Sequence, residues 1–292
     1  MAQFDQYWAA DYSGSSSIAG QRSAIRLVGY DAVGQELTDP AARYTRDTLR
    51  ETLLSVVIAA HAQDECCIIG IDHQFSVPDG LYRVLTGATW DRWEHLTELL
   101  MHGSGALPAI VEAPASNARA WVAAANALLS GYAPHLGPGP FWGASMTPGK
   151  KWPDDALQAL GITPLRQVEQ LGKGLKPLFK VGTTGAVELQ SLCGIPHLAR
   201  LLASCRDRAI PLHIWPFHGW AVPARTSCLA EVYPGLFTRG GTQAKTHEGD
   251  ARATAQALWI ADRDGTLAGW LLAAAAADIE ARAKREGWVL GF

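Results

Sequence analysis

The chain has 292 residues, of which 48% are hydrophobic and 18% charged, a balance that supports a sizeable core and argues against global disorder. Its formal charge of −3 argues against a broadly basic nucleic-acid surface but permits a local basic groove. The five cysteines show no CxxC or Cys/His zinc spacing, which indicates reduced, packed thiols and a cytoplasmic protein.

The termini give no sign of a membrane partner. Residues 1–5 have neither the basic start nor the apolar run of a signal peptide. The apolar segment 267–277 is too short and too rich in alanine to span a bilayer. We therefore predict a protein without membrane contact, and the oligomeric state is left open.

The first third of the chain predicts a small sheet and a crossover helix. A strand over 7–11 ends at Asp11 before a Ser/Gly turn, and strands over 23–30 and 35–37 complete an antiparallel meander. Asp39 is expected to cap the following helix, with Pro40 in its first turn. The apolar run 66–71 then predicts a strand covered on both faces, parallel to the first and ending at Asp72.

The remainder predicts a long insertion and a return to the sheet. Residues 79–210 are less regular, with amphipathic helices expected over 90–102 and 118–129. Two further strands are expected over 212–215 and 228–233, and a helix over 250–261. We predict one domain, 1–292, with the segment 79–210 inserted within it.

Carboxylates at strand ends form the first candidate site. If the strands ending at Asp11 and Asp72 are neighbours, the two side chains lie roughly 5 Å apart. Two carboxylates this close repel each other, and a bound divalent cation commonly neutralises them. Glu231 lies within an apolar strand, where an unpaired charge is costly. Asp250 lies in the first turn of a helix. The four converge on one crevice if the sheet has the usual order.

Each carboxylate also has a structural interpretation. Asp11 and Asp72 can satisfy the turns that follow them, and Asp250 can act as a helix cap. Glu231 can pair with Arg225 or Arg239.

The chain resembles the predicted ribonuclease H-like nucleases of domain of unknown function 429. The segments that carry this resemblance are AADYSG, IIGIDHQFSVP, VGTTGAVELQSLCGIPHLARL, AEVYPGLF and GDARATAQALWIAD. It implies an α/β fold of ribonuclease H-like type, a mixed five-stranded sheet of order 3-2-1-4-5 flanked by helices, with the insertion between the fourth and fifth core strands. It also implies that Asp11, Asp72, Glu231 and Asp250 are the metal-binding, catalytic carboxylates.

The expected activity is Mg²⁺- or Mn²⁺-dependent hydrolysis of phosphodiesters in nucleic acid or a small molecule. The predicted substrate-binding residues are Ser13, His73, Thr183, Thr184 and Gln190. Lys150, Lys151, Lys173, Lys176 and Lys180 are further candidates for phosphate contacts. Two alternatives stay open: an ATP-dependent phosphotransferase of the actin and sugar-kinase type, suggested by the turn after Asp11, and a non-catalytic ribonuclease H-like binding protein.

Overall fold

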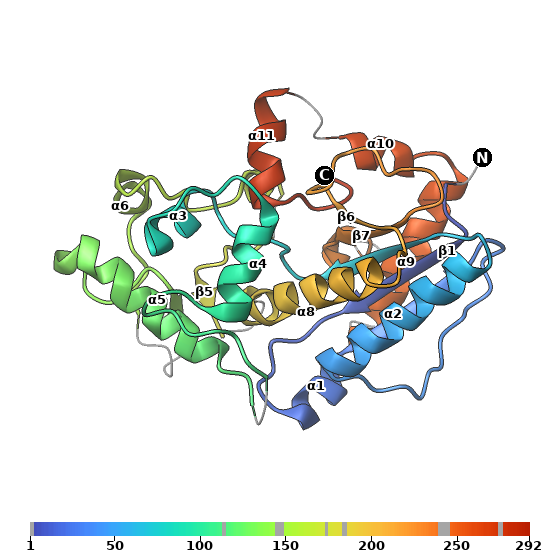
Figure 1. Cartoon of the computed structure of the whole chain (residues 1–292), viewed down its shortest axis with the longest axis horizontal. Coiled ribbons are helices and arrows are strands. Elements are labelled where there is room, and N and C mark those ends of the chain that lie inside the picture. Colours follow the sequence, from blue (N-terminus) through green and yellow to red (C-terminus); the bar gives the residue numbers. More distant parts are fainter. Residues whose placement is uncertain are drawn as a thin grey trace.

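A computed structural model describes residues 3–112, 115–143, 149–172, 175–182, 186–238, 246–273 and 277–292. Five strands form the main sheet: β1 (Gln6–Asp11), β2 (Arg26–Asp31), β3 (Cys67–Asp72), β6 (Leu212–Trp215) and β7 (Ser227–Glu231). Their spatial order is β2-β1-β3-β7-β6, and only the β1–β2 pair is antiparallel. The protein therefore has an α/β fold with a mixed sheet, as predicted (Figure 1).

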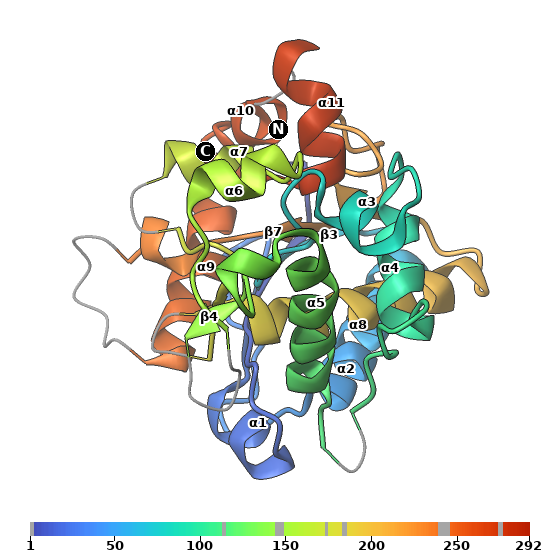
Figure 2. The ribbon, with the colours of Figure 1, turned by 90° about the vertical axis from the view of Figure 1, so that its left-hand side faces the viewer.

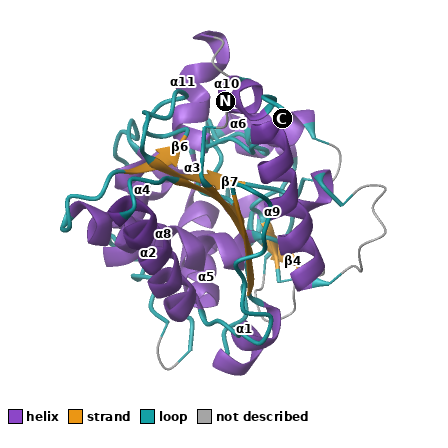
Figure 3. Ribbon diagram, turned by 90° about the vertical axis from the view of Figure 1, so that its right-hand side faces the viewer, coloured by secondary structure: helices purple, strands orange, loops and turns teal. Residues whose placement is uncertain are grey.

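Helices cover both faces of this sheet. The helices in the described part of the chain are α1 (Ile18–Ala24), α2 (Arg46–Ala62), α3 (Leu81–Thr86), α4 (Trp93–His102), α5 (Ala118–Tyr132), α6 (Asp154–Ala159), α7 (Gln167–Leu171), α8 (Glu188–Arg206), α9 (His247–Arg263), α10 (Leu267–Leu272) and α11 (Ala277–Glu286). Two single-turn 3-10 helices, η1 (Pro134–Leu136) and η2 (Pro234–Leu236), and a small parallel sheet of β4 (Trp142–Gly143) and β5 (Lys180–Val181) complete the elements. Figure 3 shows the main sheet edge-on, with α2 and α8 on one side and α9 on the other.

The predicted strand order 3-2-1-4-5 agrees with the structure only in part, and the differences lie at the two edges of the sheet. The residues expected as the third strand form only one bridge, Tyr30 with Glu36, beside β2. The strand after the insertion, β6, lies at the far edge, and β7 is the strand that pairs with β3. The pairing of β1 with both β2 and β3 is as predicted. Backbone hydrogen bonds from Asp31 N–H to the carbonyl of Gln35 and from Leu37 N–H to that of Gly29 hold the predicted third segment beside β2.

The crossover helix also begins later than predicted. Residues 39–44 are not helical, and α2 starts at Arg46. Thr45 caps it, because its hydroxyl accepts from the backbone N–H of Thr48 while the Thr48 hydroxyl accepts from that of Thr45. This reciprocal pair satisfies two otherwise free N–H donors. The Asp39 carboxylate, predicted as the cap, instead accepts a hydrogen bond from the N–H of Ala41.

Alternate residues along each strand point to opposite faces of the sheet, and therefore to different helix layers. Trp8, Ala10, Ile69 and Ile71 belong to the core under α2 and α8. The alternate positions Tyr7 and Ile68 pack in the second core, under α9 and α10. The segment 79–210 supplies α8, which packs against α2 and so forms part of the first layer. In the described part of the chain, no helix combines the length and apolarity needed to cross a membrane.

Gly70 is the point of closest approach between β3 and its neighbours on the α9 face. A Cβ atom at this position would lie 2.7 Å from Cγ1 of Val232 and 3.4 Å from Cδ1 of Leu258. We expect Gly70→Ala to destabilise the fold by about 1–3 kcal/mol, because overpacking forces neighbouring side chains to move. Urea denaturation measures this change.

The matched control is Gly131→Ala in α5, where an added Cβ meets nothing within 4 Å. Alanine is the better helix former by roughly 0.5–1 kcal/mol, so this variant is expected to be as stable as the parent or more so. Equal stability losses in both variants would contradict the packing argument.

Candidate functional site

Asp11 and Asp72 are direct neighbours at the carboxyl ends of β1 and β3. The parallel register pairs them with each other, as it pairs Ala9 with Gly70 two residues earlier. Adjacent strands are about 4.8 Å apart, and both side chains leave the sheet on the α9 face, where Ala9 packs against that helix. Asp11 is buried. Two carboxylates are therefore held side by side, with Asp11 buried and Asp72 half-buried.

The N-terminus of α9 adds a third carboxylate and an imidazole. Thr246 caps the helix through its hydroxyl, which accepts from the N–H of Gly249. The cap role proposed for Asp250 is thus filled by another residue, and Asp250 lies in the first helical turn. His247 Nδ1 lies 3.2 Å from Oδ2 of Asp11. We refer to Asp11, Asp72 and Asp250 as the acidic site.

Electrostatics within the acidic site disfavour three simultaneous negative charges. Burial raises the pKa of Asp72 well above its usual value, and the charges of Asp11, Asp250 and Glu231 raise it further. Burial also raises the pKa of Asp11, although the hydrogen bond with His247 opposes this. Burial and Asp11 together raise the pKa of Asp250. Positive charge brought to this site would relieve the repulsion.

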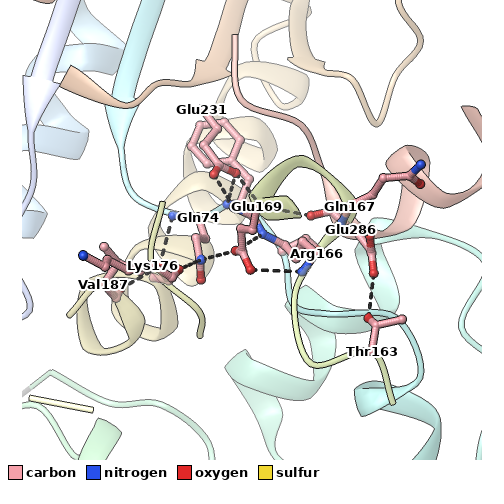
Figure 4. A network of polar contacts seen from close by, with 12 residues as sticks. Gln74, Thr163, Arg166, Gln167, Glu169, Lys176, Val187, Glu231 and Glu286 are labelled. Atoms are coloured by element: carbon pink, nitrogen blue, oxygen red, sulfur yellow. Dashed lines mark hydrogen bonds and ion pairs between the residues drawn. The ribbon is translucent and has the colours of Figure 1, made fainter. Parts of the chain in front are cut away.

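Glu231 leaves the sheet on the opposite face. Its register partner is Ile71, which packs in the core under α2 and α8. The Glu231 carboxylate accepts two hydrogen bonds from Arg166, at 2.6 and 2.8 Å, and a third at 2.9 Å from the backbone N–H of Phe75. The structure therefore pairs Asp11 with Asp72 and places Asp250 on the adjoining helix. It ties the fourth predicted carboxylate, Glu231, to Arg166 (Figure 4).

Arg166 is the centre of a buried polar network beside β7. Its Nε donates to Glu169 at 2.7 Å, and Nη1 donates to the backbone carbonyl of Glu286 at 3.0 Å. Gln74 donates to the same Glu169 oxygen at 2.5 Å. Burial raises the pKa of Glu169 to about 7 even though Arg166 lowers it. We name Gln74, Arg166, Glu169, Glu231 and Glu286 the arginine network.

A pocket opens at the end of β3, between Asp72 and the arginine network. Asp72, Gln74, Arg166, Glu169, Lys176 and Glu231 are among the residues that line it. The oxygen Oε1 of Gln74 is buried there, and no described residue donates a hydrogen bond to it. Lys176 adds a cation to a wall that otherwise carries several carboxylates. We call this hollow the strand-end pocket.

The predicted substrate-binding residues fall in different places. Gln190 donates to the backbone carbonyl of Asp72 at 2.9 Å, and the Ser13 hydroxyl accepts from the N–H of Ser15. His73 is buried against Tyr12 and Phe75, and burial lowers its pKa to about 4. Thr183 and Thr184 lie outside the described residues, as does Lys173.

Sequence reasoning missed the residues that neutralise or contact the carboxylates. Of the two arginines proposed for Glu231, Arg225 instead lies 3.6 Å from Asp64, and Arg239 is outside the described residues. Arg166 and His247 carry no local signal, since both act on residues far away in the sequence. The one available signal was Glu231 itself, because a buried carboxylate in an apolar strand requires a partner.

The chemistry of the acidic site suits magnesium or manganese, which prefer carboxylate and water oxygens. Within the described ranges, no group of three Asp, Glu, His or Cys side chains is arranged to hold one metal ion. Magnesium sites in enzymes commonly use only one or two carboxylates, with water and substrate phosphate as the other ligands. In the described part of the chain the Asp72 carboxylate accepts no hydrogen bond, so the Asp11–Asp72 pair fits this pattern.

Comparison of the chain with protein-family models, with curated proteins and with solved structures finds no match in any of the three.

Proposed function

We propose that the protein is a Mg²⁺- or Mn²⁺-dependent phosphodiester hydrolase with a ribonuclease H-like arrangement of its core. The supporting observation is the register pairing of Asp11 with Asp72 at the ends of neighbouring parallel strands, with Asp250 on the adjoining helix. In open α/β sheets this edge is the usual place for ligands. The proposed substrates are nucleic acid or a small phosphodiester, and the five buried, free cysteines suit a cytoplasmic location.

In this proposal Asp11 and Asp72 hold the metal, and Asp250 adds negative charge from the adjoining helix. A bound divalent ion would supply an activated water and stabilise negative charge on the leaving oxygen. Lys176, in the strand-end pocket, is placed to bind a substrate phosphate next to Asp72. Glu231 acts as a positioning residue, because its carboxylate anchors the N–H of Phe75 and so fixes the turn that follows Asp72.

The test uses the full chain with single-stranded RNA, single-stranded DNA and bis(p-nitrophenyl) phosphate. We expect cleavage of at least one substrate with Mg²⁺ or Mn²⁺ and none in the presence of a chelator. Calorimetry with Mn²⁺ provides a measurement that does not depend on turnover. If neither binding nor cleavage occurs, the proposal is wrong.

The ion pair between Glu231 and Arg166 favours a second candidate, a non-catalytic binding protein. This ion pair removes one of the four predicted metal ligands from the acidic site. Loss of a ligand is what we expect of a site that no longer catalyses a reaction. Binding of Mn²⁺ without cleavage of any of the three substrates would select this candidate.

A further inference from the structure

A second hollow, of about 120 Å³ and open to solvent, lies in the part of the chain between β3 and α8. This volume is smaller than the roughly 300–1,000 Å³ of a typical small-molecule site, so only part of a ligand, such as one ring system, can enter it. We name it the aromatic pocket, and the residues that define it are Pro140, Trp142, Lys151, Trp152, Asp154 and Phe179. The elements β4, α6 and α7 from this part of the chain face the viewer in Figure 2.

Two aromatic residues of this pocket are anchored, Trp152 by its side chain and Trp142 by its backbone. Trp152 is buried, and its indole N–H donates to the carbonyl of Gly137 at 3.2 Å. The backbone N–H of Trp142 donates to the carbonyl of Phe179 at 2.9 Å, which joins the two sides of the pocket. Trp142 is half-buried, so part of its ring is available to a ligand. Rigid aromatic faces of this kind stack well on flat rings such as nucleobases.

Two charged side chains of opposite sign give the pocket its polarity. Lys151 and Asp154 are both exposed, and within the described residues neither side chain forms an ion pair or hydrogen bond, including with the other. An ammonium group only donates hydrogen bonds and a carboxylate only accepts them. A flat ligand that presents an acceptor beside two donors would satisfy both groups. Guanine does so along one edge, with O6 next to N1–H and the N2 amino group.

The aromatic pocket adjoins the strand-end pocket through two shared segments. Pro164 and Leu165 line the aromatic pocket, and the next residue, Arg166, lines the strand-end pocket. Likewise, Lys176 lines the strand-end pocket and the next residue, Pro177, lines the aromatic pocket. The two pockets are thus lined by consecutive residues of the same two segments. A ligand with a base in one pocket can direct its phosphate past Lys176 toward Asp72.

We propose that the aromatic pocket binds a guanine base. Trp142 stacks on the ring, Asp154 accepts from N1–H and the N2 amino group, and Lys151 donates to O6. This inference rests on the proposed function, since it assigns to that hydrolase a guanine nucleotide or a guanine-containing single strand as its substrate.

Calorimetry of the full chain with GMP, AMP, CMP and UMP, in chelator and without metal, tests the inference. We expect GMP to bind at least about tenfold more tightly than the other three, since a bidentate contact discriminates between bases by about this factor or more. Asp154→Asn is expected to lower the affinity for GMP about tenfold and to leave that for AMP unchanged. Lys151→Met is expected to weaken GMP binding in the same direction.

The neighbouring residues provide matched controls. Asp155 lies beside Asp154 in α6 but does not line the aromatic pocket, and the same holds for Lys150 beside Lys151. Asp155→Asn and Lys150→Met are expected to bind GMP as the parent does. Equal affinities for the four nucleotides, or equal effects of test and control variants, would overturn the inference, and so would the absence of GMP binding.

The result also separates this inference from the proposed function. GMP binding without any phosphodiester cleavage would support the guanine pocket and count against the hydrolase. Metal-dependent cleavage of bis(p-nitrophenyl) phosphate without GMP binding would do the reverse.

Discussion

Arg166→Met is expected to destabilise the protein by about 3–5 kcal/mol, the usual consequence of removing one partner from a buried ion pair. Arg166 and Glu231 are both almost completely buried, and Glu169 lies against the same guanidinium. Methionine roughly preserves the volume of the side-chain stem but leaves two carboxylates in a low-dielectric environment without a cation. Denaturation by urea at about pH 8, where carboxylates are normally ionised, measures the loss.

The pH dependence of this loss gives an internal check. Burial already raises the pKa of Glu169 above its usual value, and loss of the guanidinium, which lowers that pKa, raises it further in the folded state. A group whose pKa is raised in this way weakens the fold as the pH rises. The variant should therefore recover part of its stability in mildly acidic solution.

Arg263→Met is the matched control, because Arg263 is an exposed arginine that also pairs with a carboxylate, Asp264, at 3.4 Å. A loss of no more than about 1 kcal/mol is expected there. A double variant, Arg166→Met with Glu231→Leu, should be more stable than Arg166→Met alone, since replacing both partners of a buried pair by apolar groups is often tolerated. A loss at Arg166 as small as the one at Arg263 would show that the arginine network does not stabilise the fold.

The placement of Asp11 and Asp72 could be predicted from sequence because it depends on short, strong patterns. Each follows a run of apolar or small residues that is typical of a buried strand, and a single helix between strands enforces a parallel crossover. The register then pairs the two carboxylates. The fold class followed from the same patterns, without any need to know the partners of the later strands.

The face on which Glu231 lies could not be predicted, because β7 is buried on both sides. Residues 227–231 are all buried, so there is no polar and apolar alternation to indicate which side chains point toward which helix layer. A shift of one residue in register would move Glu231 to the face of Asp72. Its partner Arg166 lies 65 residues away in the sequence, next to a short helix. No periodic pattern of residues around Arg166 predicts that it contacts Glu231. Local patterns thus located the sheet edge, whereas tertiary packing decided which carboxylates share it.

Asp72→Asn is expected to have opposite effects on activity and on the stability of the metal-free protein. Cleavage should fall by more than the ~10–100-fold that is typical for loss of a group outside the ligand shell, because Asp72 is proposed to contact the metal directly. Stability near neutral pH should increase, since the variant removes the charge most disfavoured by burial and by Asp11, Asp250 and Glu231. Rates with Mn²⁺ and urea denaturation in chelator provide the two measurements.

The sign of the pH effect follows from the direction of the pKa shift. The pKa of Asp72 in the folded protein lies well above 3.8, its usual value, so the parent loses stability as the pH rises from that value through the folded pKa. The asparagine variant has no such ionisation. The stability difference between variant and parent should therefore be smallest in acid and increase toward neutral pH.

Asp64→Asn is the control, since Asp64 is exposed and has a positive φ that asparagine also tolerates. It is expected to change neither the cleavage rate nor the effect of Mn²⁺ on thermal stability. The parent should be stabilised by Mn²⁺, whereas Asp72→Asn should not, because an ion that binds only the folded state raises its stability by an amount that grows with the ion's affinity. An asparagine variant that is less stable than the parent at neutral pH, or equally stabilised by Mn²⁺, would show that Asp72 is a structural residue and that the metal binds elsewhere.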